Sequence, residues 1–115
     1  QLVRTMKEII ASGTRPSVWK LEGLANPNDW RRVRALTRAP IIILGRGDEE
    51  DRVEALIKIG ARSRVTQGFA IGRTIFAEPL ERYLKKTISR HTALHEIAKN
   101  YLHFVQLWRT LAHRT

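Results

Sequence analysis

The 115-residue sequence contains no cysteine and no long apolar run, and only 7% of its residues are aromatic. The absence of cysteine excludes a disulfide framework, thiolate zinc ligands and a cysteine nucleophile. A bilayer span requires about 20 consecutive apolar residues. Neither such a span nor the residue succession of a secretory signal is present. These absences predict a soluble, cytoplasmic chain without a membrane partner.

Acidic residues are also scarce, with 11 Asp and Glu against 21 Lys and Arg, which gives a formal net charge of +10. A charge of this size makes nucleic acid or another polyanion a partner to consider. However, the arginines are spread over several expected helices, few aromatic residues lie among them for base stacking, and zinc-finger, RNP-like and basic-zipper patterns are missing. An arginine-rich solvated surface explains the charge better. The alternative is a non-catalytic basic fragment that binds nucleic acid or another polyanion.

Short segments with alternating or continuous apolar character predict strands, and longer segments with helical periodicity predict helices. The strands are expected at residues 17–22, 41–45 and 65–71. The helices are expected at residues 2–12, 27–39 and 49–60, in a short segment from about Pro79, and at residues 90–112. Asn26, Asp48 and Ser89 are expected as N-caps and Gly60 as a helix stop. The last helix is expected to bury Leu94, Ile97, Ala98, Tyr101, Val105 and Trp108.

The order of these elements determines the fold class. Helices and strands alternate in units of about 25–30 residues, which is typical of a parallel α/β fold. Residues 41–44 are all apolar, as in a strand covered on both faces, and three strands alone would leave that strand too little cover. Gln1 is not Met, and an apolar helical rhythm begins directly after it. We therefore expect residues 1–115 to form one incomplete α/β domain, whose missing strands come from upstream sequence or a second chain.

Lys20 and Glu22 share one face of the first expected strand and lie near its carboxyl end. Active sites of α/β barrels are built at the carboxyl ends of the strands. A partly desolvated lysine can lose its charge and attack a carbonyl to form a Schiff base, and a neighbouring carboxylate can hold or relay the proton. The spacing alone favours an exposed ion pair on a half-solvated strand.

A second group of residues has the chemistry of a phosphate site. Gly72 and Arg73 follow the third expected strand, so a backbone N–H and a planar guanidinium could meet an anion there. Gly45 follows the second strand, and its N–H could face the same anion. Phosphate sites recur at the last strands of barrels, although an ordinary strand-to-helix turn would use the same residues.

Two other motifs do not support a site. The glycines around Arg46 lack the third glycine of a dinucleotide fingerprint, and the acidic residues at positions 48–51 would repel a pyrophosphate. His91, His95 and His103 lie on one side of the last expected helix, but a third metal ligand is not evident beside them in the sequence. We therefore expect solvated histidines, no metal site and no cofactor.

At the three strand ends the sequence resembles the class I aldolase-like domain that is found fused to 5-dehydro-2-deoxygluconokinase in bacterial inositol catabolism, and that also occurs alone. The resemblance covers nearly the whole chain. It is carried by residues 18–22 (VWKLE), residues 42–45 (IILG), the more specific block 67–76 (QGFAIGRTIF) and Trp108. It implies the carboxyl-terminal part of a TIM (β/α)8 barrel, with these segments as strands six, seven and eight.

The resemblance extends to tagatose-bisphosphate-type aldolases and implies roles for individual residues. Lys20 would form the Schiff base with Glu22 beside it, and Gly45, Gly72 and Arg73 would bind the substrate phosphate. The implied reaction is cleavage of 6-phospho-5-dehydro-2-deoxy-gluconate to dihydroxyacetone phosphate and malonate semialdehyde. The sequence departs from the family's pattern at Gly23, where a proline usually follows the glutamate, and in the loop after the second strand. The 115 residues alone are expected to be inactive, because the other strands supply further catalytic groups.

Overall fold

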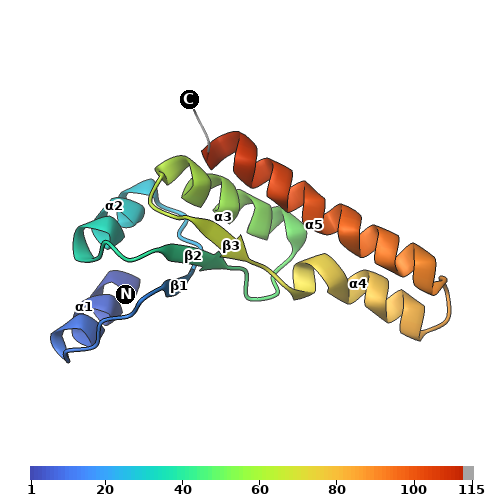
Figure 1. Cartoon of the computed structure of the whole chain (residues 1–115), viewed down its shortest axis with the longest axis horizontal. Helices are drawn as coiled ribbons and strands as arrows, with labels where there is room; N and C mark the ends of the chain where they lie inside the picture. The colour runs from blue at the N-terminus through green and yellow to red at the C-terminus, as the bar shows by residue number, and fades with distance from the viewer. Residues whose placement is uncertain (113–115) are drawn as a thin grey trace.

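The computed structural model describes residues 1–112 and has an α/β fold built on one parallel sheet of three strands (Figure 1). The strands are β1 (Trp19–Glu22), β2 (Ile41–Leu44) and β3 (Gly68–Ala70), and they lie side by side in the order β1-β2-β3. The helices are α1 (Leu2–Ala11), α2 (Pro27–Leu36), α3 (Glu50–Ser63), α4 (Arg73–Leu84) and α5 (Arg90–Ala112). Among the described residues, no helix is long and apolar enough to cross a membrane.

The helices that follow β1 and β2 cover the same face of the sheet. Trp19 and Leu21 of β1 are buried, as are their neighbours Ile41 and Ile43 in β2, whereas the alternate residues of both strands are more exposed. In the view of Figure 1 the sheet lies in front of α2 and α3, which pack against each other. Each strand lies next to the one before it in the chain, always on the same side. With right-handed connections between parallel strands, the intervening helices then lie on one face. Within residues 1–112 no helix covers the other face of the sheet, and we call it the bare face.

The three strands are shorter than the sequence predicts. The expected segments 17–22, 41–45 and 65–71 contain β1, β2 and β3, but each extends beyond the paired residues. Before β3, the side chain of Gln67 takes over part of the ladder, because its Oε1 accepts a hydrogen bond from the Ile41 backbone N–H at 2.7 Å. The Gln67 backbone N–H in turn donates to the Ile41 carbonyl oxygen at 2.8 Å. A side chain that replaces a strand partner leaves no alternation pattern in the sequence.

Gly60 lies inside α3 and does not end it, so the expected stop at residue 60 is wrong. The helix continues to Ser63 and ends at Arg64, which adopts the left-handed conformation (φ 61°). Gly60 is buried directly against β2, where an added Cβ would lie 2.2 Å from Cδ1 of Ile43. The glycine therefore serves close packing between helix and strand. The expected cap is also displaced by one residue, from Asp48 to Glu49.

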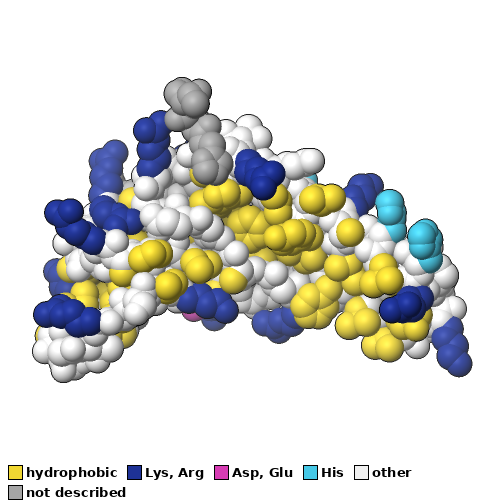
Figure 2. Space-filling view, in the orientation of Figure 1, with side chains coloured by type: hydrophobic (Ala, Val, Ile, Leu, Met, Phe, Trp, Pro, Cys, Tyr) yellow, Lys and Arg dark blue, Asp and Glu magenta, His cyan; other side chains and the backbone are white. Residues whose placement is uncertain are grey.

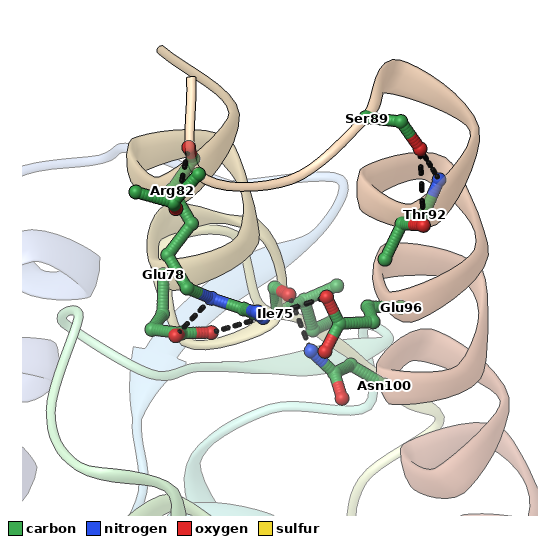
Figure 3. A network of polar contacts seen from close by, with 8 residues as sticks. Ile75, Glu78, Arg82, Ser89, Thr92, Glu96 and Asn100 are labelled. Atoms are coloured by element: carbon green, nitrogen blue, oxygen red, sulfur yellow. Dashed lines mark hydrogen bonds and ion pairs between the residues drawn. The ribbon is translucent and has the colours of Figure 1, made fainter. Parts of the chain in front are cut away.

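The expectation of a short helix from Pro79 is likewise wrong, because α4 begins at Arg73 and Pro79 lies within it. Proline lacks the N–H that would bond the carbonyl four residues earlier, which belongs to Ile75. The side-chain amide of Asn100 in α5 donates to that carbonyl oxygen instead, at 2.9 Å (Figure 3). A residue 25 positions away along the chain thus satisfies the backbone group that the proline leaves open.

An ionic cluster joins the outer parts of α4 and α5. Arg82 of α4 donates to Glu96 of α5 at 2.6 Å and also pairs with Glu78 one turn earlier in its own helix (Figure 3). These carboxylates raise the pKa of Arg82, with the Glu96 hydrogen bond as the largest cause.

The expected cap of α5 is present, since the Ser89 hydroxyl accepts from the Thr92 N–H at 3.1 Å.

The buried stripe of α5 differs in part from the expected one. Trp108 is buried as expected, but Ala93 and Phe104 are the other buried residues, whereas Leu94 and Tyr101 are 53% and 52% exposed. Both sets of residues recur at helical spacing, so the sequence shows two apolar faces without indicating which one meets α3. Figure 2 shows hydrophobic side chains that continue on one side of the molecule from the sheet across α4 and α5.

Candidate functional site

The carboxyl ends of the three strands meet at one edge of the sheet, and the sequence-predicted residues lie along that edge. Lys20 and Glu22 are both exposed and project from β1 onto the bare face. Their neighbours on that face are Ile42 and Leu44 of β2, which are only partly buried. Trp19 points to the opposite face and packs in the core beneath the helices. The structure therefore brings Lys20 and Glu22 onto one face, as the alternation predicts.

Arg46 also belongs to this edge and was not among the predicted site residues. It follows Gly45 in a turn closed by a hydrogen bond from the Asp48 N–H to the Gly45 carbonyl oxygen. In this turn Arg46 has φ 60°, and its guanidinium donates to Glu22 at 3.3 Å. Because the direction of the side chain depends on the left-handed turn, the spacing of charges in the sequence gave no signal for the contact.

Arg73 ties the end of β3 to the turn after β2. Its guanidinium donates to the Arg46 carbonyl oxygen at 3.0 Å, and the hydroxyl of Thr74 donates to the Asp48 carbonyl oxygen at 2.8 Å. Gly47 has φ 73°, and a Cβ at this position would lie 2.5 Å from Cζ of Arg73. The left-handed backbone conformation favours glycine at residue 47, and a larger residue there would displace the flexible guanidinium of Arg73.

The beginning of α4 has two features that attract an anion. Gly72 is its N-cap, and neither a side-chain cap nor an acidic residue lies in its first turn. By contrast, the first turn of α3 contains Glu50 and Asp51. The N-terminus of a helix attracts negative charge through its N–H groups and dipole. Gly72, Arg73 and the turn that begins at Gly45 therefore lie together, with chemistry suited to phosphate.

Several of the basic residues considered for polyanion binding have intramolecular partners. Arg34 donates to the carbonyl oxygens of Thr37 and Val65 at 3.1 and 2.7 Å, and Arg31 donates to the Asn28 side chain at 3.3 Å. Lys85 pairs with Glu81, whose carboxylate raises the pKa of the lysine. Lysine and arginine side chains lie mainly around the margins of the face seen in Figure 2, with no continuous basic surface across its centre.

The sequence is similar to one described family of bacterial proteins. A family model described as "Uncharacterized protein conserved in bacteria (DUF2090)" matches residues 1–112, which is nearly the whole chain. No curated protein matches the sequence. No solved structure matches it either.

Proposed function

The chain belongs to the DUF2090 family of conserved bacterial proteins, and we propose that it is part of a class I aldolase. In this proposal it supplies the last three strand–helix units of a TIM barrel, and the complete barrel cleaves a phosphorylated keto sugar acid through a Schiff base on Lys20. The observation that carries the proposal is that the candidate residues lie along one edge of the sheet. A lysine and a carboxylate on the bare face lie at the same end of the sheet as Arg73 and the start of α4.

The winding of the sheet supports the barrel. The strand order follows the chain order, and the helices lie on one face, as in a singly wound barrel. In a barrel the uncovered face looks inward, so Lys20, Ile42 and Gly68 would point toward the axis. Closure by further strands would also cover the outer edges of β1 and β3, which have no neighbour within the described chain.

In the proposed reaction the Lys20 amine attacks the keto carbon of the substrate, and water leaves as the iminium forms. The iminium then accepts the electron pair of the breaking carbon–carbon bond, so that an aldehyde is released and an enamine remains on the lysine. Protonation of the enamine and hydrolysis of the iminium release the phosphorylated ketone. Glu22 holds or relays the protons in these steps, and burial in the complete barrel would favour the neutral amine.

The phosphate of the substrate would bind between the N–H groups of Gly72 and Gly45, with Arg73 beside them. Arg73 contacts the turn after β2, which holds its guanidinium at this edge of the sheet. Arg46 is close enough to Glu22 to influence the proton-transferring carboxylate. The specific substrate, 6-phospho-5-dehydro-2-deoxy-gluconate, is the part of the proposal that rests most on the family resemblance.

The departure from the family pattern at Gly23 has a physical reason in this chain. An added Cβ at Gly23 would lie 2.7 Å from Cβ of Leu56 in α3. The connection after β1 therefore passes too close to α3 for a larger residue, proline included. The glycine changes the connection that follows β1, and it does not alter Lys20 or Glu22.

Borohydride trapping tests the mechanism. The complete encoded polypeptide, or the complex purified with it, is incubated with dihydroxyacetone phosphate and sodium borohydride, and the labelled lysine is located by mass spectrometry. We expect a stable adduct on Lys20, and none in Lys20→Arg. Lys58→Arg is the matched control, since Lys58 lies on α3 and away from the strand ends. Labelling at another lysine, or cleavage that depends on an added metal, would refute the class I mechanism.

A further inference from the structure

Away from the strand ends, three metal-ligating side chains converge between α3 and α5. Glu50 and Glu54 lie one helical turn apart on α3, and His103 faces them from α5. One ligand atom from each side chain lies within 4.8 Å of the other two. Glu54 is partly buried, whereas Glu50 and His103 are exposed. This cluster is separate from the site proposed above, because it lies on the helices that cover the opposite face of the sheet.

The fold holds these side chains in place. Residues four apart share one face of a helix, so Glu50 and Glu54 point the same way. The neighbouring residue of His103 is Phe104, which is 1% exposed and anchors α5 in the core. The imidazole ring also packs edge-on against the Phe104 ring, with the ring centroids 5.3 Å apart. The close packing of α3 and α5 therefore brings a nitrogen ligand to two carboxylates.

The two oxygens of Glu54 have different partners. Its Oε2 lies 3.0 Å from Nε2 of His103, and its Oε1 lies 3.0 Å from Nζ of Lys58. The hydrogen bond to His103 is the largest cause that lowers the pKa of Glu54, followed by the hydrogen bond to Lys58. The carboxylate is therefore ionised at neutral pH, and the oxygen that faces His103 is not the one that Lys58 binds.

We propose that Glu50, Glu54 and His103 bind a zinc ion that links α3 to α5. Zinc accepts both imidazole nitrogen and carboxylate oxygen, at about 2.0–2.2 Å. The Glu54 and His103 ligand atoms are already 3.0 Å apart, and the Glu50 carboxylate, within 4.8 Å of both, would swing toward the ion. The nitrogen ligand favours zinc over magnesium or calcium, which prefer all-oxygen sites. Three protein ligands leave a coordination position for water, and Lys58 orients Glu54 through its second oxygen.

Zinc binding requires a change in proton position at His103. The metal needs the lone pair of Nε2, so the neutral ring must carry its proton on Nδ1. Any proton that Nε2 shares with Glu54 in the metal-free chain is then displaced. The expected structural consequence is that a bond through the metal replaces the present hydrogen bond between α3 and α5.

Metal titration of the untagged, chelator-treated complete polypeptide, or of the complex purified with it, tests the site. Calorimetry with Zn²⁺ should show one ion per chain, and Co²⁺ in its place should give visible d–d absorption. His103→Gln and Glu50→Gln should each weaken zinc binding by at least about tenfold, since loss of even an outer-shell group commonly costs that much. The Glu50 variant leaves the contacts of Glu54 with His103 and Lys58 intact, so it separates loss of a ligand from loss of packing.

His95→Gln is the matched control, because His95 lies on α5 two turns before His103 and is not part of the cluster. Its zinc affinity should equal that of the unchanged chain. The proposal is overturned if the unchanged chain binds no zinc at about 0.1 mM, or if the His103 and Glu50 variants bind zinc as the unchanged chain does. Circular dichroism of each variant should show that its helices are retained.

Discussion

Gly60 gives a sharp test of packing at the scale of one residue. In most helix interiors alanine is more favourable than glycine by about 1 kcal/mol. Here an added Cβ would lie 2.2 Å from Cδ1 of Ile43, a side chain that is itself 1% exposed. Overpacking of a core costs about 1–3 kcal/mol. We therefore expect Gly60→Ala to lower the free energy of unfolding, as measured by urea denaturation.

Gly68→Ala is the control for this prediction, because no atom lies within 4 Å of the added Cβ at that position. Its free energy of unfolding should stay close to that of the unchanged chain. An equal or increased stability of Gly60→Ala would show that Ile43 can adopt another rotamer at little cost, and that close packing does not explain the glycine.

Arg73 decides between the two functions considered for this chain. If it binds substrate phosphate, Arg73→Ala should weaken binding of a phosphorylated sugar acid by about 1.5–3 kcal/mol, the range for hydrogen bonds to charged groups. Nonspecific DNA binding should barely change. Calorimetric titration of the complete protein with both ligands provides the measurement.

The polyanion alternative predicts the opposite pattern for the same ligands. DNA binding would depend steeply on salt and would weaken on removal of charge at Arg31, Arg32 or Lys85, without preference for a phosphorylated sugar. An unchanged sugar-phosphate affinity in Arg73→Ala would remove the proposed anion site. For the sugar-phosphate titration alone, Arg31→Ala is the charge-matched control, because Arg31 lies on α2 and not at the carboxyl edge of the sheet.

The positions of some candidate site residues could be predicted from the sequence, and the contacts of others could not. Alternation along a strand was sufficient to place Lys20 and Glu22 on one face, because side chains of a strand point to opposite sides in turn. Parallel topology was sufficient to place Gly45 and Gly72 at the same edge. The contact of Arg46 with Glu22 depends on a left-handed turn, and the cluster around His103 depends on the packing of two helices. Neither leaves a local pattern in the sequence.

Among the elements, α5 offers the clearest comparison of a covered and an uncovered face. Trp108 is 7% exposed and packs against Phe69, with ring centroids 6.1 Å apart, whereas Tyr101 is 52% exposed. Removal of a buried aromatic side chain costs about 3–5 kcal/mol. We expect Trp108→Ala to lose stability in this range and Tyr101→Ala to lose far less, as measured by chemical denaturation. A comparable loss at Tyr101 would show that another surface covers it.

Element boundaries were predictable where one residue determines them locally. Asn26 caps α2 by accepting from the Asn28 N–H at 2.9 Å, and Ser89 caps α5 in a similar way. The start of α4 was not predictable, because Pro79 normally ends or begins a helix and is accommodated here by Asn100 from another element. The start of β3 was not predictable either, because the Gln67 side chain takes the place of a strand partner.

At the scale of the whole molecule, the bare face and the outer strand edges predict association. Ile42 and Leu44 are only partly buried on that face, and Val18, directly before β1, is 48% exposed. Burial of such surface is favourable, and unpaired parallel edges can pair with another chain. Sedimentation of the isolated 115-residue chain should therefore show dimers or larger species. A cooperatively folding monomer would contradict the interpretation of the chain as part of a larger barrel.

The strand order has a consequence for the way in which the protein is made. Each strand pairs with the one synthesised just before it, and α2 packs against both α1 and α3. At the usual 5–20 residues per second, a ribosome needs roughly 6–23 seconds for a stretch of this length. Most pairings of β1, β2 and their helices can therefore form while α5 is still inside the ribosomal tunnel. The last helix, which packs on both α3 and α4, joins them only after it has left the tunnel.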